Sequence, residues 1–301
     1  MKMTGAQAVI ECLKREQVQV VFGYPGGAVL TLYDELYKAK FPHVLTGHEQ
    51  GAVHAADGYA RATGRPGVCF ATSGPGVCNM VTGIATANMD SIPLVVISGQ
   101  VATPLIGRDS FQEADISGIT TPITKHNYLV KNVKELPRVL KEAFYIATTG
   151  RPGPVLVDIA KDVFDTPFEF EYPEEVHLRG YQGHHVGNEA DVDRAVEAIE
   201  KAKRPVILTG GGVVLSNMSE RLKHIVQHMH VPVVTTLMGK GCVPDTYDAH
   251  LAWSACMART LQYGRYEMRP PGRHRRPIRR PRHWRRRKFR AERADRPLRY
   301  R

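Results

Sequence analysis

Residues 68–98 read VCFATSGPGVCNMVTGIATANMDSIPLVVIS, and this stretch decides the expected fold. Residues 68–71 form a short apolar run that favours a buried strand, and Ser73-Gly74-Pro75-Gly76 turns the chain into a helix that runs to about Asn88. Residues 94–98 form a second, strongly apolar strand. Strands that are apolar throughout and alternate with helices are typical of a parallel sheet with both faces covered.

The same alternation continues on both sides of this stretch. Thr4 favours the N-cap position of a helix, and helical periodicity follows it. Further helices are expected at 28–37, 49–63 and 136–148, and further strands at 18–22, 43–45 and 155–159. The sequence therefore predicts an α/β fold with a Rossmann-like, doubly wound and mainly parallel sheet over residues 1–165.

A second α/β unit is expected at residues 189–250. Residues 166–188 are rich in acids and aromatic residues without a clear period, and we interpret them as a linker. After the linker come a helix (190–203), a strand (206–209), Gly210-Gly211-Gly212, a helix (215–229) and a strand (231–235). Half a doubly wound sheet cannot bury both faces of its strands, so this second domain is predicted to be truncated.

Charge is distributed unevenly along the 301 residues, whose formal net charge is +11. Residues 251–301 contain 17 arginines, one lysine and three acids, a net charge of +15, which leaves −4 for the first 250 residues. This Arg-rich tail has too few spaced apolar residues to form a core and is predicted to be disordered. It is either a nucleic-acid-binding arm, with Trp284 and Phe289 beside the arginines, or a segment translated out of frame.

Several classes of protein are excluded by simple patterns. No apolar run approaches the roughly 18 residues of a membrane-spanning helix. The N-terminus enters an amphipathic segment instead of a signal-peptide core, and the five cysteines are scattered without a CxxC pair. We therefore expect a cytoplasmic protein with reduced thiols, no membrane association and no metal site built from its cysteines.

Three glycine-rich loops follow predicted strands, at residues 24–27, 73–76 and 210–212. Ligands of open parallel sheets bind at the carboxyl ends of strands, but none of these loops matches a full GxGxxG or phosphate-loop pattern. Each loop alone is interpreted as a tight turn. Glu49 stands in the first turn of a small-residue helix, where a carboxylate either stabilises the helix start or faces a bound cofactor. Residue chemistry alone favours the helix-start interpretation.

Seven motifs in order change this balance. They are FGYPGGA (22–28), GHEQGA (47–52), ADGYAR (56–61), TSGPG (72–76), MDSIP (89–93), FQEAD (111–115) and GRPGPVLVD (150–158). Each motif is weak alone, but the ordered set resembles the large catalytic subunits of acetolactate synthase, which are thiamine-diphosphate enzymes of branched-chain amino-acid synthesis. The resemblance runs from about residue 4 to residue 250. It departs from the usual pattern at Ala102 and Ser110.

The resemblance implies roles for matching residues. Glu49 is implied to hydrogen-bond the aminopyrimidine ring of thiamine diphosphate and to favour the tautomer that activates the cofactor by proton transfer. The implied cofactor pocket comprises Tyr24, Pro25, Gly26, Glu49, Thr72, Pro75, Asn79 and Gln112. The implied substrate channel comprises Gly27, Phe111, Gln112 and Lys161. An FAD surface is implied for Arg151, Gly211, Gly212, Thr236, Leu237 and Met238.

The implied reaction is the decarboxylation of pyruvate and transfer of a hydroxyethyl unit to a second 2-oxo acid, pyruvate or 2-oxobutyrate. The family's Mg²⁺ ligands lie in a GDG…N motif of a third domain, which this chain lacks, so the chain is predicted to be inactive alone. Implied partners are further large subunits, as a dimer or tetramer, and a small regulatory subunit, with no nucleic acid. The alternatives are another thiamine-diphosphate carboligase or decarboxylase, and a nucleic-acid-binding protein that acts through its tail. Glyoxylate carboligase lacks the family's glutamate, so Glu49 disfavours it.

The tail itself can be tested against the family in other reading frames. With suitable codons, residues 269–284 read from the second base give DLLVAIGARFDDRVT, which resembles the family's GARFDDR segment. Residues 251–260 read from the third base similarly give GMVGMHGT. Because the two stretches need different offsets, we predict two single-base deletions, one near codon 251 and one near codon 260.

Overall fold

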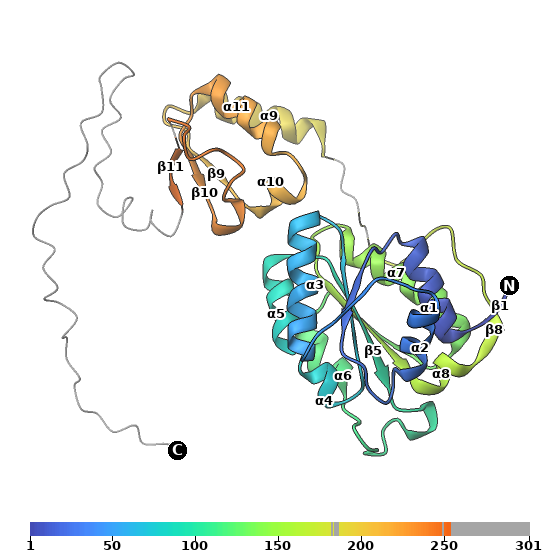
Figure 1. Cartoon of the computed structure of the whole chain (residues 1–301). Helices are drawn as coiled ribbons and strands as arrows, with labels where there is room; N and C mark the ends of the chain where they lie inside the picture. The colour runs from blue at the N-terminus through green and yellow to red at the C-terminus, as the bar shows by residue number, and fades with distance from the viewer. Residues whose placement is uncertain (182, 184–186, 249, 254–301) are drawn as a thin grey trace, which may run out of the picture.

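The computed structural model describes residues 1–181, 183, 187–248 and 250–253, in two units that follow each other along the chain (Figure 1). Apart from residues 251–253, the Arg-rich tail lies outside the described residues, and so does the prediction that it is disordered.

A six-stranded parallel sheet forms the centre of the first unit. Its strand order is β3-β2-β4-β5-β7-β6, and every neighbouring pair is parallel. The strands are β2 (Val21–Gly23), β3 (His43–Leu45), β4 (Gly67–Ala71), β5 (Leu94–Gln100), β6 (His126–Val130) and β7 (Pro154–Ala160). The predicted α/β fold with a mainly parallel sheet is confirmed.

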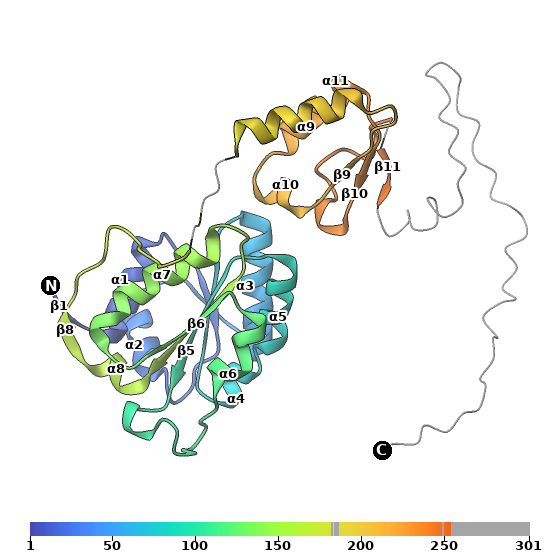
Figure 2. The same cartoon turned by 180° about the vertical axis from the view of Figure 1, so that it is seen from behind.

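Helices cover both faces of this sheet (Figures 1 and 2). One face carries α1 (Gly5–Arg15), α2 (Leu30–Lys38), α7 (Leu136–Thr148) and α8 (Lys161–Asp165). The other carries α3 (Glu49–Thr63), α4 (Pro75–Cys78), α5 (Val81–Asp90) and α6 (Ile116–Thr120). Short 3₁₀ turns, η1 (Thr103–Leu105), η2 (Thr121–Ile123) and η3 (Val133–Glu135), complete the unit.

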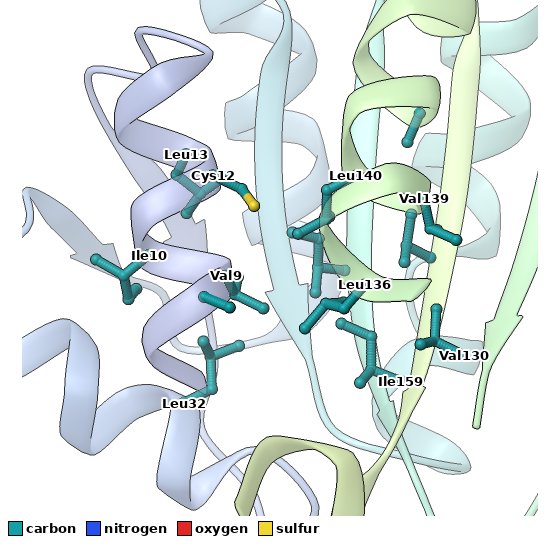
Figure 3. Close-up of a cluster of buried hydrophobic side chains, with 14 of the residues drawn as sticks. Val9, Ile10, Cys12, Leu13, Leu32, Val130, Leu136, Val139, Leu140 and Ile159 are labelled. Atoms are coloured by element: carbon teal, nitrogen blue, oxygen red, sulfur yellow. The ribbon is translucent and has the colours of Figure 1, made fainter. Parts of the chain in front are cut away.

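Two apolar cores lie on the two faces because strand side chains alternate in direction. In β4, Val68 and Phe70 belong to the core under α1 and α7, whereas Cys69 and Ala71 belong to the core under α3 and α5. Figure 3 shows the first core, where Leu13 of α1 and Leu140 of α7 contribute to one buried cluster.

Helix ends follow local signals. Thr4 caps α1 in a capping box with Gln7, as its residue type predicted. Helix α3 ends at Gly64, whose φ of +69° is a left-handed conformation that glycine adopts without steric cost. The single helix predicted after Gly76 is wrong, because the structure has two helices, α4 and α5. Asn79 lies between them and uses its side chain to bind Glu49.

The N-terminal residues pair with the segment that follows α8. Strand β1 (Lys2–Thr4) pairs antiparallel with β8 (Pro167–Glu169), and Phe168 and Phe170 are buried in the first core. The segment expected as a linker at 166–188 therefore begins within the first unit. Three-residue strands such as these are too short to show a period in the sequence.

The second unit contains a three-stranded parallel sheet of order β11-β10-β9. Its elements are α9 (Glu189–Lys201), β9 (Ile207–Thr209), α10 (Gly211–Leu215), α11 (Ser219–Met229), β10 (Val233–Thr235), η4 (Leu237–Gly239) and β11 (His250–Trp253). The single helix expected at 215–229 is divided in the structure. Helix α10 ends at Leu215, α11 begins at Ser219, and Asn217 between them has a φ of +56°. The unit's core cluster is small, with Val226, Val233, Cys242 and Val243 buried, and no residue of α9 is buried.

Candidate cofactor and substrate site

Strand order brings two glycine-rich loops together. After β2 the chain adds β3 on one side of β2, and it then returns to add β4 on the other side. The loops that leave β2 and β4 diverge at this reversal, which is where open α/β sheets bind ligands. The loop after β2 begins at Tyr24, and the loop after β4 begins at Thr72.

Glu49 lies at the start of α3, beside this reversal. Its side chain is buried, with a relative exposure of 8%, and its Oε2 atom accepts a hydrogen bond of 3.0 Å from Nδ2 of Asn79. The preceding residue, His48, is the N-cap and accepts a hydrogen bond from the Gln50 backbone N–H at 3.1 Å. Glu49 is thus fixed by its helix and by one amide, with no cationic hydrogen-bond partner among the described residues.

Thr72 joins the two loops. Its Oγ1 accepts a hydrogen bond of 3.1 Å from the Ala28 backbone N–H. A Cβ atom on Gly26 would lie 2.5 Å from the Thr72 side chain, so only glycine fits there. A Cβ on Gly76 would lie 2.7 Å from Thr72 Cγ2 and 3.3 Å from Glu49 Oε1. The structure therefore brings Gly26, Glu49, Thr72 and Asn79 into one group.

Pro75 and Tyr24 border this group. Pro75 is the first residue of α4, where its missing N–H has no helical partner to lose. Tyr24 keeps 41% of its surface exposed in the loop after β2. The Glu49 carboxylate and the Asn79 amide offer acceptor and donor groups that suit a planar heterocycle with ring nitrogens. Glycines at positions 26 and 76 let the Thr72 side chain pack directly against the backbone beside them.

The four residues predicted for the substrate channel line one cavity of about 520 Å³. Its lining includes Gly27, Phe111, Gln112 and Lys161, together with Ser73, which directly follows Thr72. Phe111 is 88% exposed, on a loop between β5 and α6. Gln112 lies close to the loop after β4, because a Cβ on Gly74 would be 2.3 Å from the Gln112 carbonyl oxygen. Gly74 has a φ of +58°, which favours glycine for a second reason.

Sequence reasoning missed several residues of this cavity. Asp162 and Asp165 also line it, and the Asp162 carboxylate accepts hydrogen bonds from the backbone N–H and the hydroxyl of Thr103 at 2.9 and 3.0 Å. The available signal was their position directly after the apolar run of β7, because polar residues at the carboxyl end of a parallel strand face the ligand edge. Ala28, Val101, Ala102 and Leu105 complete the lining.

The residues predicted for FAD fall into two places. Gly211 and Gly212 begin α10, and Thr236, Leu237 and Met238 follow β10, with a Cβ on Gly211 only 2.9 Å from Met238 Cβ. Arg151 instead lies in the first unit, where its guanidinium donates to Ser91 Oγ at 2.6 Å and to the Met89 carbonyl at 3.3 Å. These hydrogen bonds tie Arg151 to the end of α5 and not to the loops of the second unit.

Two absences hold for the part of the chain that the structure describes. These residues contain no group of three or more His, Cys, Asp or Glu side chains arranged to hold a metal ion. None of their helices is both long enough and apolar enough to cross a membrane.

Comparison with known families agrees with this geometry. Residues 3–119 match the N-terminal TPP binding domain of thiamine pyrophosphate enzymes, and residues 192–263 match the central domain of the same enzymes. The central-domain match extends past the boundary expected at residue 250. The chain therefore belongs to the thiamine pyrophosphate enzymes.

Within that class, its relatives are acetolactate synthase large subunits. The chain is 51% identical over 251 residues to the acetolactate synthase large subunit of Corynebacterium glutamicum, which covers 83% of this chain and 40% of the relative. It is 52% identical over 252 residues to a probable acetolactate synthase large subunit of Methanocaldococcus jannaschii, covering 83% and 43% of the two chains. With the Haemophilus influenzae large subunit it shares 49% identity over 248 residues, 81% and 43% of the two chains. The chain thus spans about two fifths of the length of these relatives.

Proposed function

We propose that the first unit supplies the aminopyrimidine half of a thiamine-diphosphate site, and that the complete protein of which this chain spans a part forms acetolactate from two 2-oxo acids. The observation that carries this proposal is the buried contact between Glu49 and Asn79 at the reversal of strand order. The thiamine pyrophosphate domain match over residues 3–119 supports the cofactor, and the identity to acetolactate synthase large subunits supports the reaction.

Glu49 would hold the proton that the cofactor exchanges. Asn79 donates to Oε2 of Glu49, and Oε1 lies toward Gly76, where a Cβ would stand only 3.3 Å from it. Tyr24, Pro25, Gly26, Thr72, Pro75 and Gln112 would complete the pocket. When bound, thiamine diphosphate supplies a thiazolium carbon that adds to the carbonyl group of a 2-oxo acid. The chain's own contribution is to bind and orient the ring and to hold a proton at Glu49.

The 520 Å³ cavity lined by Phe111 and Lys161 would bind the 2-oxo acids. Lys161 is the cationic residue among its lining residues and would pair with a substrate carboxylate, while Phe111 and Leu105 offer apolar surface to the substrate's alkyl group. Gly27 lines the cavity, and a side chain at this position would project into open space, since no atom lies within 4 Å of where its Cβ would stand. These contacts suit small molecules such as pyruvate and 2-oxobutyrate.

The remaining cofactors and partners follow from the family resemblance. Gly211, Gly212, Thr236, Leu237 and Met238 would contribute to an FAD surface, to which Arg151 would contribute from the first unit. Mg²⁺ would be held by residues of a further domain. Further large subunits and a regulatory subunit would complete the assembly. The free thiols of Cys12, Cys69, Cys78 and Cys242 suit a reducing compartment such as the cytoplasm.

The test is an assay of acetolactate formation from pyruvate with thiamine diphosphate, Mg²⁺ and FAD. We expect activity from the product of a gene in which the two frame changes near codons 251 and 260 are reversed, and none from the 301-residue chain. Release of acetaldehyde without acetolactate would instead identify a decarboxylase. Salt-dependent nucleic-acid binding by the 301-residue chain that vanishes when residues 251–301 are deleted, together with an inactive frame-restored product, would favour the nucleic-acid alternative.

A further inference from the structure

One side chain closes both ends of the loop that carries Phe111 and Gln112. Gln100 is the last residue of β5 and is buried, at 4% exposure. Its Oε1 accepts a hydrogen bond of 2.9 Å from the Val101 backbone N–H, where the loop begins. Its Nε2 donates to the Ala114 carbonyl at 3.2 Å, where the loop ends. The two ends of the segment 101–114 are thereby held at the same amide group.

Asp158 fixes the orientation of that amide. It lies on β7 beside β5, is 1% exposed, and accepts a 2.9 Å hydrogen bond from Gln100 Nε2 at its Oδ2. Its other oxygen accepts a 2.7 Å hydrogen bond from Ser98 Oγ. Because a carboxylate only accepts hydrogen bonds, it forces the NH₂ side of Gln100 toward itself and Ala114, and the carbonyl side toward Val101.

The loop between these ends is braced internally. The Glu113 carboxylate accepts hydrogen bonds from the backbone N–H groups of Gly107 and Ser110, and these bonds lower the pKa of Glu113. Ser110 Oγ also donates to the Leu105 carbonyl at 3.0 Å. A loop with its own bracing moves as one body, so its position over the cavity is set where it is attached to the rest of the unit.

We propose that Gln100 and Asp158 are positioning residues that hold the loop 101–114 over the substrate cavity. This proposal rests on the proposed function, because the loop presents Phe111 and Gln112 to the 2-oxo acid. Asp158 acts through Gln100, and Gln100 acts through the loop's two ends. The hydrogen bonds of Thr103 to Asp162 add a third attachment beside the first end.

The polarity of the arrangement suggests a substitution at Asp158. Asp158→Asn keeps the shape of the side chain but can present an NH₂ group to Gln100. Where that NH₂ group faces Gln100, the Gln100 amide loses this bond or turns over, and turning over sets its NH₂ against the Val101 N–H and its oxygen against the Ala114 carbonyl. Where it faces Ser98 instead, the Ser98 hydroxyl can accept from it and Gln100 keeps its bond. Gln100→Ala, which removes the amide from both loop ends, is therefore the stricter test. In the double variant Gln100→Glu with Asp158→Asn, the new glutamate can accept from the Val101 N–H. It has no N–H group to donate to the Ala114 carbonyl, so that end of the loop loses its hydrogen bond.

Limited trypsin cleavage at Arg108, which is exposed in the loop, measures its opening in the full 301-residue chain. Deuterium uptake of the peptide spanning residues 101–114 gives a second readout. We expect Gln100→Ala to accelerate cleavage at Arg108 by roughly tenfold or more, the scale of one lost buried hydrogen bond. The double variant should fall between wild type and Gln100→Ala, with protection retained at Val101.

Glu142→Gln is the matched control, because Glu142 is also a buried carboxylate of the first unit but bonds Tyr128 and Arg138. Equal acceleration at Arg108 and at tryptic sites elsewhere in the first unit would show general loosening and overturn the proposal. Unchanged cleavage and uptake in Gln100→Ala would overturn it as well. These readouts need no catalysis, so they are independent of whether acetolactate is formed.

Discussion

At the residue scale, Glu49 is both an acid in the first turn of a helix and a buried carboxylate. Each property alone has an ordinary explanation. Acids favour the first turn of a helix, and buried carboxylates need partners. Here the carboxylate is nearly buried, yet its hydrogen-bond partner is a neutral amide, Asn79, and it faces the loops where the strand order reverses. A helix-start acid would do equally well exposed to water, so the burial of Glu49 is the feature that distinguishes a cofactor ligand from a capping acid.

Glu49→Gln should therefore remove catalysis while leaving the fold intact. Glutamine keeps the shape and can still bond Asn79, but it cannot take up and release the proton. We expect the rate of acetolactate formation by the frame-restored protein to fall by about 10²–10⁴-fold, the usual range for losing a positioned acid–base group. Glu11→Gln on the outer face of α1 is the control. A rate within threefold of wild type for Glu49→Gln would contradict the assignment.

Asp158 should leave a signature in the pH dependence of stability. Burial raises the pKa of Asp158 from 3.8 to about 6, against the hydrogen bonds from Ser98 and Gln100, which lower it. The folded chain therefore binds this proton more tightly than the unfolded chain. Its contribution to stability is full below about pH 4 and is lost as the pH rises through about 6, an effect of up to about 3 kcal/mol.

Urea unfolding of wild type and Asp158→Asn between pH 3.5 and 7.5 measures this contribution. The difference between the two free energies of unfolding should change steadily from about pH 4 to 6 and then level off. A difference that is constant over the whole range would contradict a raised pKa. Glu142→Gln, which removes the charge of another buried carboxylate of the first unit, is the control for a general effect of such a substitution.

Helix α3 offers a matched pair of glycines at the scale of an element. Gly64 ends the helix at a φ of +69°, whereas Gly58 lies within the helix, exposed and with open space around its missing Cβ. We expect Gly64→Ala to lower the free energy of unfolding by about 1 kcal/mol and Gly58→Ala to raise it by roughly 0.5–1 kcal/mol. Chemical denaturation measures both, and equal shifts of the same sign would contradict the role of Gly64.

Elements with local signals could be predicted from the sequence. The bounds of α3 and α7 and of β3 agree with the predicted ranges 49–63, 136–148 and 43–45, because each ends at a local break such as Gly64. Strand β6 (His126–Val130) was missed, since its mixed polar and apolar residues suit an edge strand and give no apolar run. The break between α4 and α5 was missed because it depends on Asn79 reaching Glu49, a contact between distant segments.

Site residues divide in the same way. The residues implied by the family resemblance include Gly26, Glu49, Thr72 and Asn79, which lie in one group, and Gly27, Phe111, Gln112 and Lys161, which line one cavity. Gln100 and Asp158 were not singled out, although Asp158 is the last residue of the motif at 150–158. Their roles depend on the pairing of β5 with β7, and sequence spacing does not reveal which strands become neighbours.

At the scale of the whole molecule, the charge of the chain separates into two parts. The first 250 residues carry a net charge of −4 and the last 51 carry +15. Strong polyanion binding by the full chain would thus follow from the tail alone, by release of counterions from phosphates. It would carry no information about the enzyme-like body.

This separation can be measured on a heparin column. We expect the 301-residue chain to be retained until high salt, and a variant that ends at His250 to pass through in low salt. The frame-restored protein should also pass through, since its sequence after residue 250 would no longer be Arg-rich. Retention of the His250-terminated variant would contradict this view and locate a polyanion site on the body.

The pairing of β1 with β8 also has a mechanical consequence. Residue 2 pairs with residue 169, and the Met1 carbonyl accepts a hydrogen bond from the Phe170 N–H, so the N-terminus lies beside the end of β8 in one antiparallel ladder. Tension applied between the N-terminus and the chain just after β8 loads that ladder one hydrogen bond at a time, starting at the outer pair, and leaves the contacts of Tyr181 and Gly183 with the first unit unloaded. The β1–β8 pair should therefore separate at low force, while the six-stranded parallel sheet stays intact.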